Sequence, residues 1–540
     1  MNPSTPPPDV TPSPGSAAGP RAPSPTSSDP DPTARLRRSV YSLFIVVAAG
    51  AMLGRILAVN AVDRVELERY RIERAVDTKR EALAKLGLKG PELQEALDYE
   101  EARFRNALQL QRPFLSGNDR SRWCTVRALV EDKFRVEGAP YAIDKLIDEP
   151  LWDTIDMVRA PNGHYYSSKP PLLPTLMAGP YWLIHRLTGA TLGTHPYEIG
   201  RAFLIVLNVI PLVVYFFLLA GLAERLATSD WARLAMMATA SLGTFLNTFA
   251  TVLNNHLFGA VCAGAVLYFL VRIWFEGQRR PWVFFLTGLL AAFMVANELP
   301  SLAFAAPVAL FLLYKAPRPT LFWFAPGALL VAAGFFGTNW IAFQTLKPAY
   351  AHRTGPGNWY DYTYQRNGKT YESYWKNPKS VDQGEPSVAV YVNQCLVGHH
   401  GIFSLTPMWL LSLVGGLIWL CGPTRKPPDA CPVPASPPVR LLALALLAVS
   451  LVCLTFYLFL QPLENRNYGG MCSGLRWVFW LAPLWLVLML PALDRMAQRA
   501  CLRLVALILL AASVLSAVYP IWNPWTHPWL YNFMYYLDWI

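Results

Sequence analysis

Residues 153–174 read DTIDMVRAPNGHYYSSKPPLLP and join a polar pattern to an apolar one. Residues 154–159 and 164–168 have the composition of two short strands, and the Pro-Asn-Gly of 161–163 between them is typical of a turn. Lys169 follows the second strand, and the two prolines that come next fix the backbone just beyond it. An apolar segment then starts at once, so the sequence predicts that Lys169 is held where water meets hydrocarbon.

The position of Lys169 allows two interpretations. A cation held at a membrane boundary can neutralise a phosphate at the depth of the lipid headgroups, which an enzyme with a lipid-phosphate substrate requires. The simpler interpretation is an interfacial lysine whose stem covers apolar surface while its ammonium reaches water. Residues 153–174 alone leave both interpretations open.

Composition indicates a polytopic membrane protein. Of the 540 residues, 53% are hydrophobic, 13% are aromatic and only 15% are charged. The net charge of +11 comes from short basic clusters beside apolar segments, without the long basic stripe of a nucleic-acid-binding protein. The eight cysteines show neither CxxC pairs nor metal-ligand spacing, so they predict neither a zinc module nor a disulfide framework.

We expect an all-α polytopic fold with about eleven transmembrane helices, judged by the length that a bilayer requires. The apolar segments that would form them are residues 40–59, 201–222, 233–253, 257–275, 282–296, 301–314, 321–343, 403–420, 441–460, 477–490 and 502–518. The chain then divides into a disordered Pro-rich cytoplasmic tail (1–38), a first transmembrane helix (39–60), an outer loop (61–200), a transmembrane bundle (201–345), a second outer loop (346–400), C-terminal transmembrane helices (401–519) and an interfacial aromatic tail (520–540).

The placement of charge predicts the orientation in the membrane. Basic residues at 278–280, 315–318, 425–426 and 495–499 fall in alternate loops, so the positive-inside rule assigns these loops to the cytoplasm. The N-terminus is then cytoplasmic, and the C-terminus and the polar loops are extracytoplasmic, as in a protein of the plasma membrane. Residues 172–187 would have both ends outside, so we expect them to lie along the outer leaflet or to dip into it.

The first outer loop is expected to contain two helical units. Residues 61–112 have apolar residues at three-and-four spacing on both sides of a break at 87–91, which predicts an antiparallel helical hairpin with a structural or partner-binding role. Residues 116–123 then open a further helix with Asp119 at or near its N-terminus. An aspartate there is either a plain helix cap or a functional group.

The second outer loop is rich in tyrosine. Residues 359–365 and 369–375 read as two strands around Asn367 and Gly368, which predicts a small β-hairpin. Its aromatic rings either stack on a sugar or pack at the membrane interface.

Polar groups that could carry chemistry gather on the outer side in this topology. They are Asp119, Lys169, Asn255, His256, Glu298, His399, His400 and Arg476. The central parts of the expected helices contain no charged residue, whereas an ion-coupled transporter usually needs such groups near the membrane midplane. The pattern therefore favours binding or chemistry at the outer surface.

This order of features resembles the multi-pass glycosyltransferases of the C-type fold, particularly the bacterial aminoarabinose transferases and the protein O-mannosyltransferases. The residues that carry the resemblance are Asp119, Gly163, Tyr166, Lys169-Pro170-Pro171-Leu172, and a later element with Gly469-Gly470, Ser473-Gly474 and Arg476-Trp477. The match covers the first third of the chain and extends over the rest by topology. The resemblance implies transfer of a sugar from a polyprenyl-phosphate donor to an extracytoplasmic acceptor.

Three positions depart from these families. Arg120 follows Asp119 where those families commonly have Asp-Glu, and Ser168 stands where a carboxylate often precedes the lysine. A later acidic position is replaced by the Asn-Asn-His of 254–256. Metal dependence is therefore left open: no cofactor is implied with certainty, and a divalent metal is possible.

The resulting hypothesis gives each candidate a role. Asp119 would be the general base for an acceptor hydroxyl, and Lys169 and Arg476 would bind the donor phosphate. The possible substrate contacts are Asn255, His256, Glu298, His399 and His400. The expected partners are the polyprenyl-phosphate sugar, a lipid, glycan or protein acceptor and membrane lipid, but no nucleic acid. The alternatives are a flippase or transporter of lipid-linked saccharide without catalysis, and an inactive assembly protein.

Overall fold

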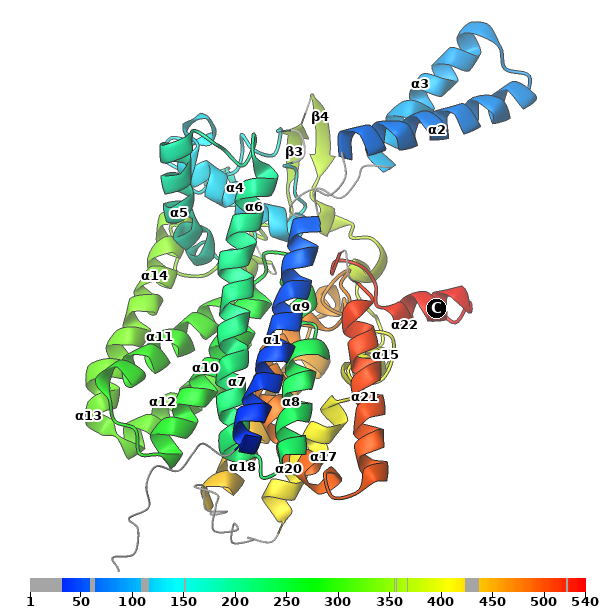
Figure 1. Cartoon of the computed structure of the whole chain (residues 1–540). Coiled ribbons are helices and arrows are strands. Elements are labelled where there is room, and N and C mark those ends of the chain that lie inside the picture. The colour runs from blue at the N-terminus through cyan, green and yellow to red at the C-terminus, as the bar shows by residue number, and fades with distance from the viewer. Residues whose placement is uncertain are drawn as a thin grey trace, which may run out of the picture.

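A computed structural model describes residues 32–58, 64–107, 116–149, 152–353, 355, 357–366, 368–422, 437–520 and 523–540. Residues 1–31 of the expected disordered tail, and Asn367 of the expected turn, lie outside this part. The described chain is mainly helical and contains two small two-stranded sheets (Figure 1). The expectation of a mainly helical fold with β-hairpins is therefore confirmed.

Several helices could cross a membrane. Six are long and apolar enough: Thr33–Ala58, Pro196–Leu226, Asn255–Phe275, Pro317–Phe343, Pro438–Phe459 and Ala500–Val518. A pair of helices bent by 42°, Arg476–Leu488 and Leu490–Met496, would make a seventh span if the pair acts as one. Shorter apolar helices cover Pro281–Asn297, Leu299–Lys315 and Trp409–Cys421. These helices indicate a membrane protein, and the count of eleven stays a prediction.

Two of the expected spans are interrupted, one at a glycine, which favours helix formation less than most residues do, and one at a proline. Helix α8 (Asp230–Leu242) ends at Gly243 and is followed by the short α9 (Leu246–Phe249). Helices α16 (Ile402–Leu405) and α17 (Trp409–Cys421) are separated at Pro407, which has no N–H to donate. Segments 233–253 and 403–420 are therefore each a broken helix instead of one continuous helix.

The bundle is built around α10 (Asn255–Phe275), which packs on α7 and α11 and on the bent segment near residue 480. The other helices of the bundle are α1 (Pro32–Ala58), α6 (Pro196–Leu204), α7 (Ile210–Leu226), α11 (Pro281–Asn297), α12 (Leu302–Lys315), α13 (Pro317–Pro319), α14 (Ala325–Phe343), α15 (Val388–Leu396), α18 (Pro437–Phe459), α19 (Ala482–Leu488), α20 (Leu490–Met496) and α21 (Ala500–Val518). Gly288 and Gly327 let α11 lie directly on α14 and the turn before it, because a Cβ at either position would overlap backbone atoms of the facing segment.

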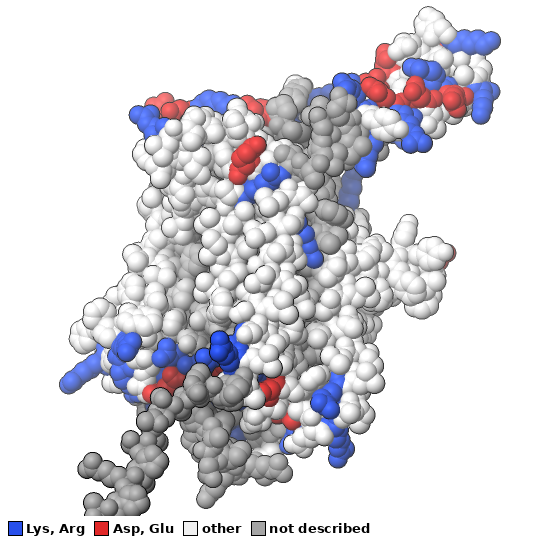
Figure 2. Space-filling model, in the orientation of Figure 1, with Lys and Arg blue, Asp and Glu red and all other residues white. Residues whose placement is uncertain are grey.

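One end of the bundle is fixed by ion pairs. Arg37 of α1 contacts Glu224 at 2.6 Å and Asp230 at 2.7 Å, which joins α1 to α7 and α8. The exposed fraction of the Arg37 side chain is 9%, so these contacts are well shielded from water. On the face shown in Figure 2, charged side chains gather at the two ends of the molecule and leave most of the middle uncharged.

The other end of the bundle carries most of the loop structure, and we call it the site end. It contains α4 (Gly117–Val130), α5 (Leu172–Thr188) and the hairpin of β1 (Met157–Arg159) with β2 (Tyr165–Ser167). Arg127 and Glu131 form a buried ion pair at 2.7 Å, and the Tyr181 hydroxyl donates to Glu131. This group ties α4 to α5, although α5 is not among the helices that could span a membrane.

Two further parts extend away from the bundle. As the spacing of the apolar residues predicts, α2 (Arg64–Lys85) and α3 (Gly90–Ala107) form a helical hairpin. This hairpin projects from the site end (Figure 1). Its small core contains Ile72, Val76 and Leu97. The C-terminal α22 (Trp529–Tyr536) also projects sideways and exposes several aromatic rings.

The second loop docks on the first. Its hairpin consists of β3 (Thr363–Arg366) and β4 (Lys369–Glu372). The hairpin is present as expected, but both strands are shorter than the expected 359–365 and 369–375, since residues 359–362 and 373–375 lie outside them. Trp375 donates its indole N–H to the Ile155 carbonyl at 2.9 Å, and the Tyr362 hydroxyl donates to the Met157 carbonyl at 3.1 Å. These contacts bring two segments far apart in the sequence to one wall of a cavity.

Candidate functional site

A cavity of about 750 Å³ opens at the site end, within the range of small-molecule sites. Four segments meet around it: the start of α4 with the β1–β2 hairpin, the second loop, the end of α18 with the chain that follows it, and Trp525 of the chain after α21. Its charged lining residues are Asp156, Lys169, Arg353, Asp382 and Arg476. We call this space the polar cavity.

The two cations predicted from the sequence, Lys169 and Arg476, both line the polar cavity. Lys169 Nζ donates to Asp156 Oδ1 at 3.0 Å. Burial lowers the pKa of Lys169 to about 8, although the charge of Asp156 acts in the opposite direction. Lys169 is therefore a positioned cation whose charge is sensitive to pH just above neutrality.

Arg476 is held by the backbone and by an aromatic ring. Its Nε donates to the Gly469 carbonyl at 2.7 Å, and its guanidinium lies 4.9 Å from the centre of the Trp525 ring. Gly469 and Gly470 have φ values of 88° and 81°, which favour glycine. Within the described part of the chain, no hydrogen bond or ion pair is found for Nη1 or Nη2 of Arg476, so these donors are available to an anion.

Asp156 of the first loop was not recognised as a candidate from the sequence. It accepts from Lys169 and, at 3.3 Å, from the Ser168 hydroxyl. Burial would raise the pKa of Asp156, but Lys169 and neighbouring arginines lower it overall, so the carboxylate stays ionised. The hairpin register supplies a signal for it: Met157 pairs with Ser167, which puts Asp156 opposite Ser168. A carboxylate partner for Lys169 is thus provided by the residue directly before β1.

Arg353 is a third cavity cation that sequence reasoning missed. Its Nη1 donates to Asn465 Oδ1 at 2.8 Å, and its guanidinium lies 4.7 Å from the Trp375 ring centre. No motif surrounds it in the sequence, because its partners come from other parts of the chain.

Asp382, in the short 3-10 helix Ser380–Gln383, is the second carboxylate of the cavity and was also missed. Tyr374 donates its hydroxyl to Oδ2 at 3.0 Å, and Asn467 donates its amide to Oδ1 at 3.0 Å. Burial raises the pKa of Asp382 above its ordinary value.

Asp119, the expected base, is the third residue of α4, and Ser116 is the cap that accepts from its N–H. Its carboxylate is buried and accepts from the Trp123 indole at 3.0 Å. Ser116 and Asn118 line the polar cavity, but Asp119 does not. Burial raises the pKa of Asp119 to about 7. Its role as a base stays a prediction.

The structure gathers Asn255, His256 and Glu298 into a network beside Asp119, outside the cavity lining. Arg122 donates to Asn255 Oδ1 at 2.7 Å, and Asn255 donates to Glu298 Oε1 at 2.7 Å. His256 Nδ1 lies 2.5 Å from the same Glu298 oxygen. These buried groups tie α4 to α10 and α11, which supports the wall of the cavity.

His399 and His400 form a separate group with their Nδ1 atoms 2.5 Å apart. The His400 ring stacks on Tyr468, directly before Gly469 of the cavity, but neither histidine lines the cavity. Burial lowers the pKa of His399 to about 4, so it is neutral at pH 7. Among the described residues, no group of three or more His, Cys, Asp or Glu side chains could hold a metal ion.

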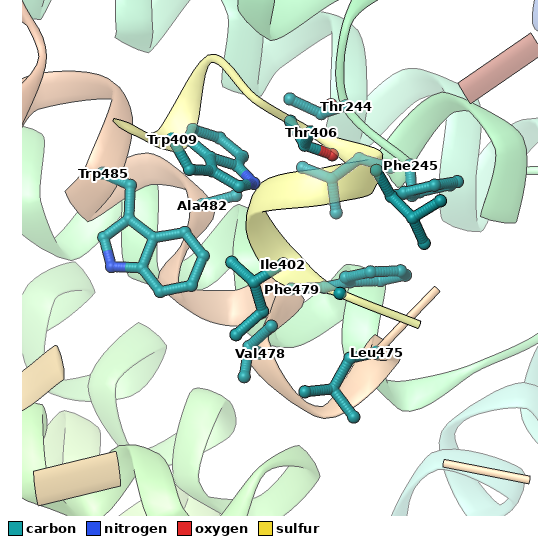
Figure 3. A pocket seen from close by; sticks show the side chains of 13 residues that line it. Thr244, Phe245, Ile402, Thr406, Trp409, Leu475, Val478, Phe479, Ala482 and Trp485 are labelled. Carbon is teal, nitrogen blue, oxygen red and sulfur yellow. The ribbon is translucent and has the colours of Figure 1, made fainter. Parts of the chain in front are cut away.

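A second, much smaller pocket of about 30 Å³ lies between α16, α17 and the bent helix pair. Figure 3 shows its walls, which include Phe245, Ile402, Trp409, Phe479 and Trp485. Its lining has no charged side chain, so we interpret it as a packing gap.

The fold and the polar cavity define a helical protein with several possible membrane-crossing helices and a charged site at one end. Comparisons with known proteins find no matching family model, no matching curated protein and no matching solved structure. The functional proposal is therefore based on the chemistry of the polar cavity.

Proposed function

We propose that this chain is an integral membrane glycosyltransferase that moves a sugar from a polyprenyl-phosphate donor to an acceptor. The observation that carries the proposal is the convergence of Lys169, Arg353 and Arg476 on one cavity large enough for a sugar phosphate. Three cations in one cavity with two carboxylates favour an anionic ligand.

Lys169 and Arg476 bind the donor phosphate. Asp156 orients the Lys169 ammonium, while Arg476 offers its Nη donors from a side fixed by Gly469. Negative charge grows on the phosphate as the bond from the sugar to the phosphate oxygen breaks. Fixed cations stabilise that charge more in the transition state than in the bound donor, which accelerates the reaction.

The aromatic walls suit the sugar, and the neighbouring helix suits the lipid. Tyr360, Trp375 and Trp525 line the polar cavity and provide aromatic surface for a sugar ring. Tyr457 lines it from the end of α18, one of the helices that could cross a membrane. Exposed apolar residues near this end, such as Phe459 and Leu460, provide a surface along which the polyprenyl chain lies.

The proposal retains the expected topology. About eleven transmembrane segments, six of them helices long and apolar enough to cross a membrane and others shorter or broken, hold the protein in the plasma membrane with its N-terminus in the cytoplasm, and the polar cavity opens on the extracytoplasmic side. The resemblance to the C-type glycosyltransferases supports the donor class. The acceptor is a hydroxyl group of a lipid, a glycan or a protein, and no nucleic acid takes part.

The test uses the full chain, purified and reconstituted in lipid nanodiscs. Polyprenyl-phosphate sugars are supplied with a lipid-linked glycan, a free oligosaccharide or a serine-containing peptide, and release of polyprenyl phosphate is measured. We expect release with at least one donor and acceptor, and its loss in Arg476→Ala. Lys376→Ala is the matched control, because Lys376 is a surface cation of the second loop that pairs with Asp361 and Glu372. Donor binding without any release would indicate the carrier function instead.

A further inference from the structure

We propose that Asp382 is the general base of the transfer, accepting the proton of the acceptor hydroxyl while Arg476 holds the donor phosphate. This inference rests on the proposed function and assigns the base to Asp382, which lines the polar cavity, in place of Asp119, which does not. It follows from the arrangement of Asp382, Gly470 and Arg476 inside the polar cavity.

Asp382, Gly470 and Arg476 line the same part of the polar cavity. A Cβ built on Gly470 would lie 3.4 Å from Asp382 Oδ1 and 3.9 Å from Arg476 Nη2. Both polar atoms therefore lie beside Gly470 on the wall of the polar cavity. A sugar bound in the polar cavity next to Gly470 would have its phosphate at Arg476 and an incoming hydroxyl at Asp382, which is the separation of roles that the reaction needs.

The position of Asp382 is fixed by two contacts of the residues that follow it. Gly384, two residues later, lies against the Leu463 carbonyl so closely that any side chain would collide with it. Glu385 donates its backbone N–H to the Arg466 carbonyl at 2.9 Å. The second loop is thus attached to the chain after α18 at this point, so Asp382 has a defined place opposite Gly470.

Of the two cavity carboxylates, Asp382 is also the better proton acceptor. Asp156 is occupied by Lys169, and the pKa of Asp156 is lowered, so it is a weak base. Asp382 has no ion pair within the described ranges, and it is held by the neutral donors Tyr374 and Asn467. Burial and the nearby Asp156 raise its pKa, while Tyr374, Asn467 and Arg476 act against this rise. A raised pKa makes a carboxylate a stronger proton acceptor.

The step balances without another reactant. The acceptor oxygen forms a bond to the anomeric carbon, and its proton moves to Asp382. The bond from that carbon to the phosphate oxygen breaks, and its electron pair leaves with the polyprenyl phosphate, which gains one negative charge beside Lys169 and Arg476. Asp382 later releases the proton to water.

The experiment compares Asp382→Asn with wild type in nanodiscs, using the donor and hydroxyl acceptor that support turnover in the assay above. We expect release of polyprenyl phosphate to fall by about a hundred-fold or more, with donor affinity within about three-fold of wild type. Asp361→Asn is the matched control, because Asp361 is an exposed aspartate of the same loop.

A second acceptor separates loss of the base from loss of structure. Azide is an anionic nucleophile that carries no proton to remove, so Asp382→Asn should use azide at a rate close to that of wild type. Turnover of Asp382→Asn within about three-fold of wild type with the hydroxyl acceptor would overturn the inference, as would an equal loss with azide. Absence of turnover in wild type with every donor would instead refute the proposed function, and this inference with it.

Discussion

Lys169 Nζ and Asp156 Oδ1 lie 3.0 Å apart across the β1–β2 hairpin, and both side chains line the polar cavity. The pair is buried enough that the ammonium is costly to keep charged, and the pKa of Lys169 falls to about 8. Asp156 is the largest influence in the opposite direction. Binding of an anion by Lys169 should therefore depend on pH and on Asp156.

The first prediction concerns the pH dependence of donor binding. As pH rises through 8, Lys169 loses its proton, so the affinity for a polyprenyl-phosphate donor should fall. Lys169→Arg should bind with little change between pH 7 and 9, because a guanidinium stays protonated. Binding is measured by titration of a fluorescent donor analogue into nanodiscs. Equal pH profiles for the two proteins would contradict the role of Lys169 in binding.

The second prediction concerns Asp156→Asn. Loss of this carboxylate removes the charge that supports the Lys169 ammonium, so the pH at which donor affinity falls should move down from that of wild type. At pH 8 the donor affinity should decrease by about 1 to 3 kcal/mol, as for loss of one charge-assisted contact. Asp153→Asn, in the same loop but outside the cavity lining, provides the control. Stronger donor binding in Asp156→Asn would show that Lys169 needs no carboxylate.

The third prediction concerns the link between α4 and α5. Arg127 and Glu131 are almost completely buried, and Glu131 also accepts from Tyr181. Glu131→Gln leaves the arginine without its charge partner, so stability should fall by about 3 to 5 kcal/mol. Glu101→Gln, which breaks an exposed pair with Arg105 on α3, should change stability by less than about 1 kcal/mol. The stability of wild type, Glu131→Gln and Glu101→Gln is compared by thermal unfolding in the same detergent. Equal losses of stability in the two variants would contradict the importance of the buried pair.

Local patterns explain what could be predicted from the sequence. The β1–β2 hairpin and the α2–α3 hairpin depend on turn residues and apolar spacing within a few tens of residues, and both are present in the structure. Lys169 and Arg476 were found because each stands in a recognisable local motif. Asp156 was within reach as well, since the hairpin register puts it opposite Ser168.

The rest of the cavity depends on contacts between distant segments, which no local sequence pattern indicates. Trp375 contacts Ile155 across 220 positions of sequence, and contacts of the second loop with distant segments, such as Arg353 with Asn465 and Asp382 with Asn467, bring Arg353 and Asp382 to the cavity. Periodicity also overestimated helix continuity at 233–253 and 403–420, because an apolar run does not reveal whether Gly243 or Pro407 ends a helix in the folded chain. Asp119 was recognised in a helix start, but its burial against Trp123 follows from tertiary packing.

The fourth prediction uses stability to measure the charge of Asp119. Burial raises the pKa of Asp119 from its ordinary 3.8 to about 7. The stability that this group contributes is therefore fully present below pH 4 and is lost as pH rises through 7, because the unfolded chain gives up the proton first.

Asn cannot ionise, and its side-chain oxygen can still accept from Trp123. The melting temperature of Asp119→Asn relative to wild type should thus increase from pH 4 to about pH 7 and stay level from there to pH 9. Asp361→Asn, at an exposed position, should follow wild type at every pH. If instead the difference in melting temperature between Asp119→Asn and wild type is constant, Asp119 is already ionised throughout this range. Asp119 would then be interpreted as a charged partner of Arg122 in the folded protein.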